Sequence, residues 1–275
     1  MKLKLVKPAQ GFAWFRQGLI VSRHQPLTFV SLLGLSLSLA MVLIGLPVVG
    51  PLIVVGGMPA MWLGFMLATR RVLQGMRVSP IVLFEAFRGP DAPRRTLAQL
   101  GGFYVMATLL IMQFAQFVGP DPEALADVFD AAKDVTDVIN NPMVQQDITI
   151  RGLLTIPVSL LFWHAPALIL WAGLPVGKSL FFSGIACWRN LGAFVVYGLS
   201  WGVSVILLGL LTQALVTLIP VAWVANVVTI VAGMWLASAF YASLYFTVVD
   251  CFEPTAPSAE PDQSVDRDTP TSGQA

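Results

Sequence analysis

The chain has 275 residues, of which 56% are hydrophobic and only 11% charged, with 16 basic against 15 acidic side chains. Ordinary soluble domains contain roughly 25% charged residues. The composition therefore excludes a typical water-soluble domain and predicts an all-α, polytopic membrane helix bundle. The only two cysteines are Cys187 and Cys251. We expect both on the cytoplasmic side, where a structural disulfide is not favoured.

The N-terminal segment lacks the pattern of a cleavable signal peptide. Its first apolar run begins only after Pro26, is long enough to span a membrane and has no small-x-small cleavage pattern. We therefore expect the N-terminus to be retained. Residues 11–24 resemble an interfacial helix, because Phe12, Phe15 and Leu19 share one face at helical spacing.

Six apolar segments are long enough to span a bilayer. A spanning helix needs about 20 mostly apolar residues, since each residue rises about 1.5 Å through a core about 30 Å thick. Within lipid the backbone must satisfy its own hydrogen bonds, so such isolated runs are helices rather than open strands. The predicted spans are approximately residues 27–46, 52–69, 97–118, 152–173, 191–218 and 221–249.

The distribution of Lys and Arg predicts the orientation of these spans. Short loops rich in basic residues remain in the cytoplasm. Fourteen of the 16 basic residues fall on one side of the predicted topology, and only Lys133 and Arg151 fall on the other. We therefore expect both termini in the cytoplasm of a bacterial inner membrane. The loops between spans supply a predicted cytoplasmic basic interface of Arg70, Arg71, Arg77, Arg88, Arg94, Arg95, Lys178 and Arg189.

Two short segments between spans are predicted to be interfacial elbow helices. The first begins at Ser79, has a proline at its first helical position and stops at Gly89. The second extends from Lys178 to Arg189. Aligning the two elbows gives an offset of 98 residues. This offset indicates either a parallel internal duplication of span, elbow and span, or chance similarity between two apolar elbows.

Between spans three and four the sequence predicts an amphipathic helix on the periplasmic side. Asp121 and Pro122 start it, and apolar residues from Leu125 onward recur at helical spacing. An acidic row on its opposite face favours a solvated helix packed over the bundle. The alternative is a divalent-cation site or a cation-attracting mouth. The chain after residue 252 is rich in Pro, Ser, Thr and acids, so we expect residues 253–275 to form a disordered tail beyond a membrane domain of residues 1–252.

Polar residues within the spans are the candidate intramembrane site. His164, two residues before Pro166, is the ionisable residue expected near the middle of a span. It is either a proton relay or ligand contact, or a neutral histidine that bonds a neighbouring helix. Gln113, Gln116 and Asn226 either line a path or hold helices together. No metal site or cofactor is expected, because imidazole and thiol groups are too few and too scattered.

Three stretches carry a resemblance to a known group of proteins: residues 22–27 (SRHQPL), 162–168 (FWHAPAL) and 178–199, which begins KSLFFSGIACWRN. They are similar to the signatures of an uncharacterised proteobacterial family of six-span inner-membrane proteins with cytoplasmic elbow helices. More distantly, the chain resembles the membrane domain attached to some glycerophosphodiester phosphodiesterases, but it lacks their soluble catalytic domain. The resemblance implies the topology and no catalytic residue.

These features favour an accessory inner-membrane protein that binds lipids or a partner. Basic residues at the cytoplasmic surface attract anionic head groups, and close helix packing at Gly198 and Gly202 is predicted either within one chain or between copies. The alternative is a small-solute transporter or channel. An enzyme is not expected, because no HExxH, GxSxG or paired aspartates occur in the spans. Anionic lipid, a membrane-protein partner or a second copy is the expected partner, and nucleic acid is not.

Overall fold

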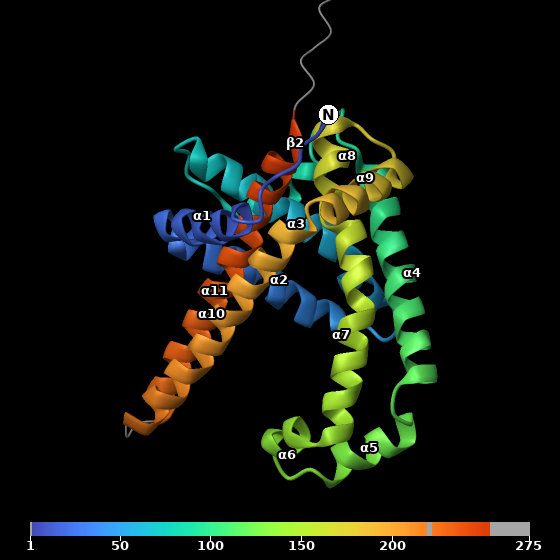
Figure 1. Cartoon of the computed structure of the whole chain (residues 1–275), viewed down its shortest axis with the longest axis vertical. Coiled ribbons are helices and arrows are strands. Elements are labelled where there is room, and N and C mark those ends of the chain that lie inside the picture. Colours follow the sequence, from blue (N-terminus) through green and yellow to red (C-terminus); the bar gives the residue numbers. More distant parts are fainter. Residues whose placement is uncertain (1, 219–221, 254–275) are drawn as a thin grey trace, which may run out of the picture.

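The computed structural model describes residues 2–218 and 222–253. Within them six helices are long and apolar enough to cross a membrane, which confirms the predicted all-α bundle (Figure 1). These helices are α2 (Pro26–Ile44), α3 (Val49–Leu73), α4 (Arg94–Val118), α7 (Pro142–Phe162, continued by α8, Ala165–Ala172), α10 (Leu191–Leu218) and α11 (Ala222–Cys251).

Shorter elements connect and cover the spans. They are α1 (Gln10–His24), the 3₁₀ helix η1 (Pro80–Phe87), α5 (Pro122–Ala131), α6 (Val135–Asn140), α9 (Val176–Arg189) and the two-residue strands β1 (Lys2–Leu3) and β2 (Phe252–Glu253). The strands pair antiparallel, with Lys2 opposite Glu253. The N-terminal strand therefore lies directly beside the end of the last span, so both ends of the described chain are on one side of the bundle.

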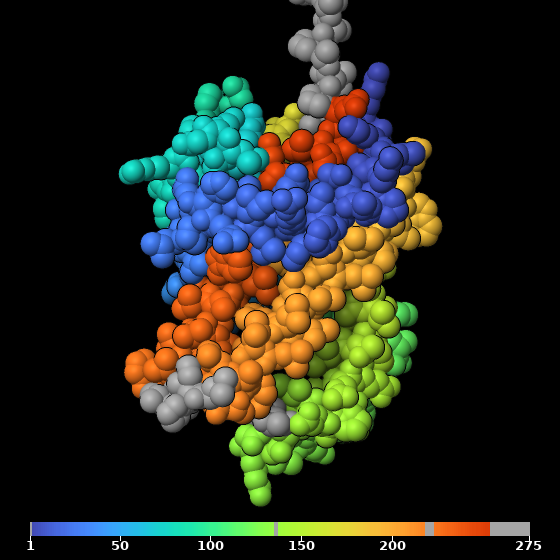
Figure 2. Space-filling view, turned by 60° about the vertical axis from the view of Figure 1, so that its left-hand side comes forward, coloured from blue at the N-terminus to red at the C-terminus, as the bar shows by residue number. Residues whose placement is uncertain are grey.

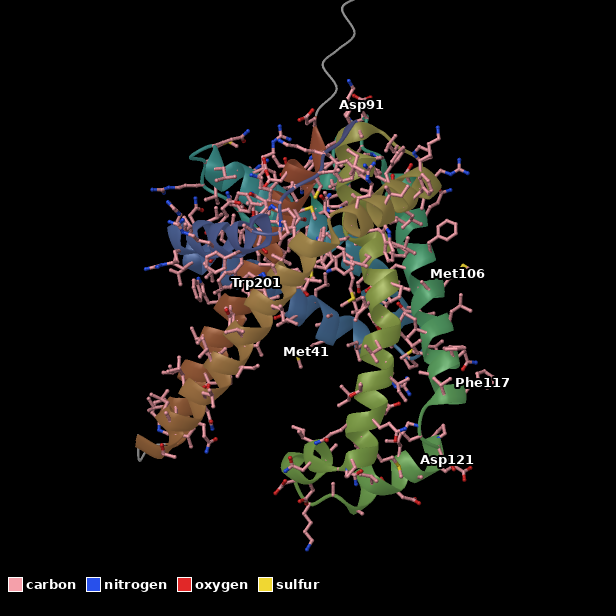
Figure 3. The ribbon with its side chains drawn as sticks, in the orientation of Figure 1. Met41, Asp91, Met106, Phe117, Asp121 and Trp201 are labelled. Atoms are coloured by element: carbon pink, nitrogen blue, oxygen red, sulfur yellow. The ribbon has the colours of Figure 1, made fainter. Side chains whose placement is uncertain are left out.

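The bundle has two chemically different sides. The side that holds β1, β2, α1, α9 and η1 carries most of the Lys and Arg residues and is called the basic side. The opposite side holds α5 and α6 with their aspartates and is called the acidic side. In Figure 3, Asp91 lies at the first end and Asp121 at the other.

Toward the acidic side the helices separate into two legs (Figure 1). The α10–α11 hairpin forms one leg, and α4 with α7 forms the other. Apolar side chains cover the outside of both legs: Met106 is 59% and Phe117 87% exposed, and both point away from α4 (Figure 3). Met41 of α2 points into the space between the legs. This surface is what lipid acyl chains contact in a membrane protein.

Helix α1 lies across α10 and α11, and in Figure 2 the N-terminal part of the chain covers their upper parts. Close approach depends on two glycines. A Cβ atom at Gly11 would lie 2.0 Å from the Ala193 oxygen of α10, and one at Gly18 would lie 2.4 Å from Ser243 Cβ of α11. Trp14, between the glycines, is fully buried. The predicted helix is confirmed, but it is part of the core as well as of the surface.

Three predicted span boundaries are corrected. The second span continues to Leu73 and includes Arg70 and Arg71 in its last turn, because the long side chains of arginines let a helix extend past the apolar core. The fourth begins at Pro142, not at residue 152. The last extends to Cys251. Hydropathy locates the apolar core of a helix, whereas caps and tertiary contacts decide where the helix ends.

The short elements differ in detail from their predictions. The first elbow is a 3₁₀ helix and Ser79 makes no side-chain cap bond, whereas the second elbow is the α-helix α9. The internal duplication stays a prediction. Both elbows lie between two spans on the basic side, but one is a 3₁₀ helix and the other an α-helix. On the acidic side, the prediction of one continuous amphipathic helix is wrong. It is broken between Ala131 and Val135 into α5 and α6.

Glycines of the spans differ in how closely they approach neighbouring helices. At Gly198 and Gly202 a Cβ would meet no atom within 4 Å, so close packing there within the chain is wrong; packing between copies stays a prediction. The second and third spans do pack closely, because a Cβ at Gly101 of α4 would lie 2.4 Å from the oxygen of Gly56 in α3. The predicted disordered tail lies outside the described residues, except for Glu253, which is in β2. The predicted start of the last span, residue 221, also lies outside the described residues.

Candidate functional site

His164 lies at a break between α7 and α8, and it is fully buried. In a continuous helix its N–H would donate to the carbonyl of Leu160. Here the Ser183 hydroxyl of α9 lies between them. It accepts from the His164 N–H at 2.9 Å and donates to the Leu160 oxygen at 2.9 Å. Pro166, which has no N–H, removes a further bond of the ladder. A side chain from another helix therefore stabilises the break.

The depth of His164 differs from the prediction. Helix α7 alone has 21 residues, a rise of about 31 Å, which is enough to cross the apolar core. His164 follows the basic-side end of α7 and contacts α9, which lies at the same end of the molecule as β1 and β2 (Figure 1). Along the span from Pro142 to Ala172, His164 is therefore nearer the basic-side end than the predicted position near the middle, because the helix begins earlier in the chain.

The imidazole of His164 is enclosed by thiol and aromatic groups. Its Nδ1 atom is 3.6 Å from Cys187 Sγ, and the rings of Phe194 and Phe252 lie 5.8 and 5.3 Å from its own. Among the described residues Nε2 has no partner in hydrogen-bonding geometry. Burial, and secondarily Cys251, raises the pKa of the Cys187 thiol well above its usual range, so this thiol is protonated and a poor nucleophile at neutral pH.

Asn190, directly after α9, connects three parts of the chain. Its Nδ2 donates to the carbonyls of Lys4 and Ala186 at 3.1 and 3.0 Å, and its Oδ1 accepts from the Val6 N–H at 2.8 Å. Cys251 Sγ is 3.6 Å from the same Nδ2. Both cysteines are buried and free. The amide of Asn190 thus holds the N-terminal segment beside the end of α11.

A second connection is centred on Asp250 of α11. One oxygen of its carboxylate accepts from Gln10 Nε2 at 2.6 Å and from Trp14 Nε1 at 2.7 Å. Both donors lie on α1. Hydrogen bonds to a charged acceptor are stronger than neutral ones, so Asp250 anchors α1 to the last span. Sequence reasoning missed this residue because its partners are more than 200 positions away in the chain.

The structure does not assemble the predicted intramembrane polar site. Gln113 and Gln116 are exposed near the acidic-side end of α4, and Asn226 is exposed near the corresponding end of α11. Each lies within about 8 Å of its helix end, at a rise of 1.5 Å per residue. They are therefore separated from buried His164 by most of the length of the spans. Near the ends of spanning helices, water of the membrane interface can hydrate the side-chain amides of these residues.

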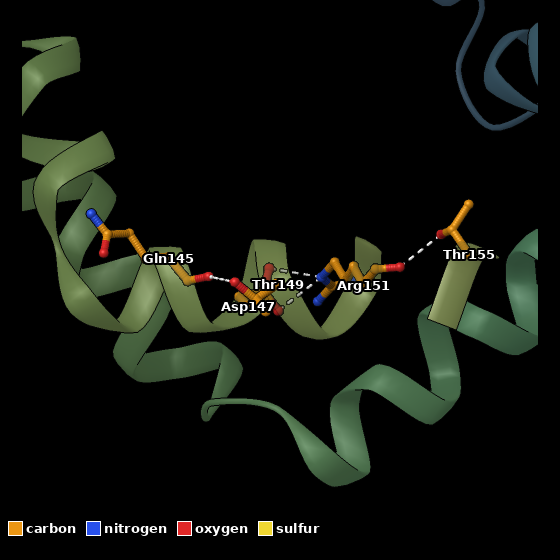
Figure 4. A network of polar contacts seen from close by, with 5 residues as sticks. All are labelled: Gln145, Asp147, Thr149, Arg151 and Thr155. Atoms are coloured by element: carbon orange, nitrogen blue, oxygen red, sulfur yellow. Dashed lines mark hydrogen bonds and ion pairs between the residues drawn. The ribbon is translucent and has the colours of Figure 1, made fainter. Parts of the chain in front are cut away.

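One charged pair inside a spanning helix was missed by the sequence analysis. Arg151 Nε donates to both carboxylate oxygens of Asp147, at 2.8 and 2.7 Å, one turn apart on α7 (Figure 4). Thr149 and Thr155 donate to backbone carbonyls of the same helix. Sequence reasoning placed both charges in a loop because the span was expected to start at residue 152. An i, i+4 pattern of Asp and Arg was the signal that could have placed them on a helix.

The predicted basic interface divides into two groups. Arg71 forms an ion pair with Glu85 at 2.7 Å, and Arg94 donates to the Phe87 and Gly89 carbonyls at 2.7 and 2.9 Å. These two arginines tie η1 and its loop to α3 and α4. The other members are exposed and have no ion-pair partner among the described residues: Arg70, Arg77, Arg88, Arg95, Lys178 and Arg189.

Exposed apolar side chains accompany these basic residues. On η1 they are Ile81 and Phe84, which are 46% and 47% exposed. On α9 they are Phe181, Phe182 and Trp188, of which Trp188 is 73% exposed. An amphipathic segment with basic and aromatic residues at its surface is typical of a helix in the membrane interface. The basic side can therefore contact both the head groups and the upper acyl region of one leaflet.

The described residues contain no group of three His, Cys, Asp or Glu side chains placed to hold a metal ion. Two surface hollows stand out. One, of about 410 Å³, lies between the start of α2 and the loop after α3 on the basic side. The other, of about 330 Å³, lies beside α5 and α6 on the acidic side and is lined in part by Asp127 and Asp137. Neither includes His164.

Fold and surface together define a multi-pass α-helical membrane protein with a basic side and elbow helices. Over 265 residues the chain is 35% identical to BTH_II0599 of Burkholderia thailandensis, whose name describes it as a probable inner membrane protein. The match covers 94% of this chain and 97% of the relative. The chain belongs to the family of this inner-membrane protein. No family model matches the chain, and no solved structure matches it.

Proposed function

We propose that this inner-membrane protein is a non-catalytic accessory protein whose basic side faces the cytoplasm and binds anionic phospholipids. The observation that carries the proposal is the set of six exposed basic residues without ion-pair partners among the described residues. Each basic group near an anionic membrane surface contributes about 1 kcal/mol of attraction. Six such groups in one surface give a marked preference for anionic over neutral lipid.

Among the described residues, most acidic groups on this side are already engaged, which supports the proposal. Glu85 pairs with Arg71, Asp250 accepts from α1, and Glu253 lies 3.9 Å from Lys4. They therefore do little to neutralise the exposed basic residues. The cytoplasmic orientation is inferred from the same asymmetry, since basic loops resist translocation.

Solute transport is the second candidate, and one observation favours it. The Asp147–Arg151 pair lies in a spanning helix, and ionisable residues at membrane depth often belong to a transport path. The pair is local, however, because both residues lie on α7 one turn apart. The two hollows lie at opposite surfaces of the molecule. Lipid binding accounts for more of the exposed groups and is therefore ranked first.

The experiment is native mass spectrometry of the whole protein, released from nanodiscs with equal amounts of phosphatidylglycerol and phosphatidylcholine. We expect wild type to retain phosphatidylglycerol in preference to phosphatidylcholine. The triple variant Arg88→Gln, Lys178→Gln and Arg189→Gln removes three exposed positive charges from the elbows and should lose most of this preference. The preference should fall because the triple variant attracts the anionic head group less strongly.

Lys133→Gln is the matched control, because it removes one exposed positive charge from the acidic side. It should retain the wild-type lipid pattern. Equal retention of both lipids by wild type, or an unchanged preference in the triple variant, contradicts the proposal. A co-purifying small solute in place of lipid would favour transport instead.

A further inference from the structure

The hollow on the basic side has a definite construction. It is lined by Gln25, Pro26, Leu27, Thr28, Arg77 and Val78, and its volume is about 410 Å³. Small-ligand sites generally measure about 300 to 1,000 Å³. The lining contains one positive charge and no acidic side chain. Its electrostatic character therefore suits an anionic group of modest size.

The hollow lies at a membrane surface. Helix α2 begins at Pro26, and α3 ends at Leu73, four residues before Arg77. Both helices are candidate spans, so these two ends meet at the same face of the bilayer. Leu27 is 84% exposed and Met76 43% exposed. Exposed apolar side chains thus lie next to the exposed guanidinium of Arg77. A glycerophospholipid needs both, because its phosphate is anionic and its acyl chains are apolar.

The side chain of Gln25 holds the two walls of the hollow together. Its Nε2 donates to the Met76 carbonyl at 3.0 Å, and its Oε1 accepts from the Val78 N–H at 3.4 Å. Thr28 Oγ1 also donates to this Oε1, at 3.4 Å. Arg77 lies between the two backbone groups that Gln25 binds, and the buried Val78 anchors the loop. The base of the Arg77 side chain is therefore positioned while its guanidinium has no ion-pair partner among the described residues.

We propose that this hollow is a specific site for the phosphate of an anionic glycerophospholipid, which Arg77 binds while Leu27 contacts the glycerol and upper acyl region. Arginine presents parallel N–H donors that match two phosphate oxygens. Gln25 is a positioning residue that preserves the hollow by linking α2 to the loop. The proposal rests on the proposed lipid-binding function and assigns it one preferred site.

Lipid titration followed by native mass spectrometry tests the site in the full chain, with phosphatidylglycerol as probe and phosphatidylcholine as reference. Arg77→Gln should weaken binding of the first phosphatidylglycerol about tenfold, as expected for loss of a charge-assisted contact. Arg77→Lys should weaken it less, because the charge remains without the bidentate geometry. Gln25→Ala should weaken it while Arg77 is still present, and Lys133→Gln should leave it unchanged.

Soluble probes distinguish the source of the phosphate. Inorganic phosphate and glycerol phosphate at millimolar concentration should not displace the bound lipid, because they lack the acyl contact with Leu27. Displacement by either one overturns the lipid assignment. Unchanged phosphatidylglycerol affinity in a folded Arg77→Gln protein overturns the site. If Arg77→Gln leaves the affinity unchanged but the elbow triple variant loses its lipid preference, lipid binding by the basic side stands and only the Arg77 site fails. If the triple variant also keeps its preference, both the site and the proposed function fail.

Discussion

At the scale of single residues, the break at His164 shows how a buried polar group is accommodated. The Ser183 hydroxyl replaces a missing helical bond by accepting from one backbone group and donating to the other. An unbridged buried N–H or carbonyl would cost about 1–3 kcal/mol. His164 thus lies where the end of α7 packs against α9 and β2. This arrangement favours a packing role for the residue over a proton path.

Gly11 provides the clearest residue-scale prediction. Gly11→Ala would place a Cβ 2.0 Å from the Ala193 oxygen and 2.7 Å from the Tyr197 nitrogen. Because both are backbone atoms of α10, α1 must move away, and we expect a loss of roughly 1–3 kcal/mol of stability. Thermal unfolding in detergent should show a lower midpoint for this variant.

Gly198→Ala is the matched control on α10, since its Cβ would meet no atom within 4 Å. It should unfold at or above the wild-type temperature, because alanine favours a helix over glycine by about 1 kcal/mol. Equal midpoints for Gly11→Ala and Gly198→Ala would show that α1 does not pack against α10 as described.

At the scale of elements, α1 acts as a brace across the last two spans. It packs on α10 and α11. Its aromatic side chains contact rings of α10, and the ring of Phe15 is 4.8 Å from that of Trp201. Asp250 accepts hydrogen bonds from Gln10 and Trp14 near the start of the helix. An interfacial helix attached only to lipid would lack such contacts. The brace joins the N-terminal segment to the leg that α10 and α11 form.

Asp250→Ala tests this brace. The change removes the acceptor of both Gln10 and Trp14, so α1 should open locally more often while the spans stay folded. We expect faster amide hydrogen exchange in residues 10–24, measured by mass spectrometry. Asp91→Ala, at an exposed loop position, should leave that exchange unchanged. Uniform protection of α1 in both variants would disprove the anchoring role of Asp250.

At the scale of the whole molecule, both ends of the described chain lie on one side, and an even number of candidate spans among the described residues is consistent with this arrangement. Which side faces the cytoplasm follows from the basic residues and stays a prediction. Because exposed arginines gather at the ends of α3, η1 and α9, the same prediction puts the proposed lipid sites in the inner leaflet. Orientation and lipid binding are therefore linked through the same side chains.

Reporter fusions test the orientation. Alkaline phosphatase inserted between α5 and α6, after Ala132, should be active because it folds only in the periplasm. A fluorescent protein fused after the last residue should fluoresce in the cytoplasm. Each reporter exchanged to the other position should be silent. The reverse pattern would overturn the inferred orientation and move the basic surface to the outer leaflet.

The sequence by itself determined the all-α class, the six spans and the segregation of basic residues. These properties depend on composition and on runs of about 20 apolar residues, which remain visible without tertiary contacts. It also marked His164 as a buried polar candidate two residues before Pro166, and proline acts locally on the backbone.

Only the tertiary structure decided the rest. It placed Asp147 and Arg151 inside a spanning helix, moved His164 to the basic end of its span, and separated Gln113, Gln116 and Asn226 from it. It also joined Asp250 to α1 and built the Arg77 hollow from two segments about 50 residues apart. Such features arise from contacts between distant parts of the chain, and local hydropathy carries no information about which distant residues will meet.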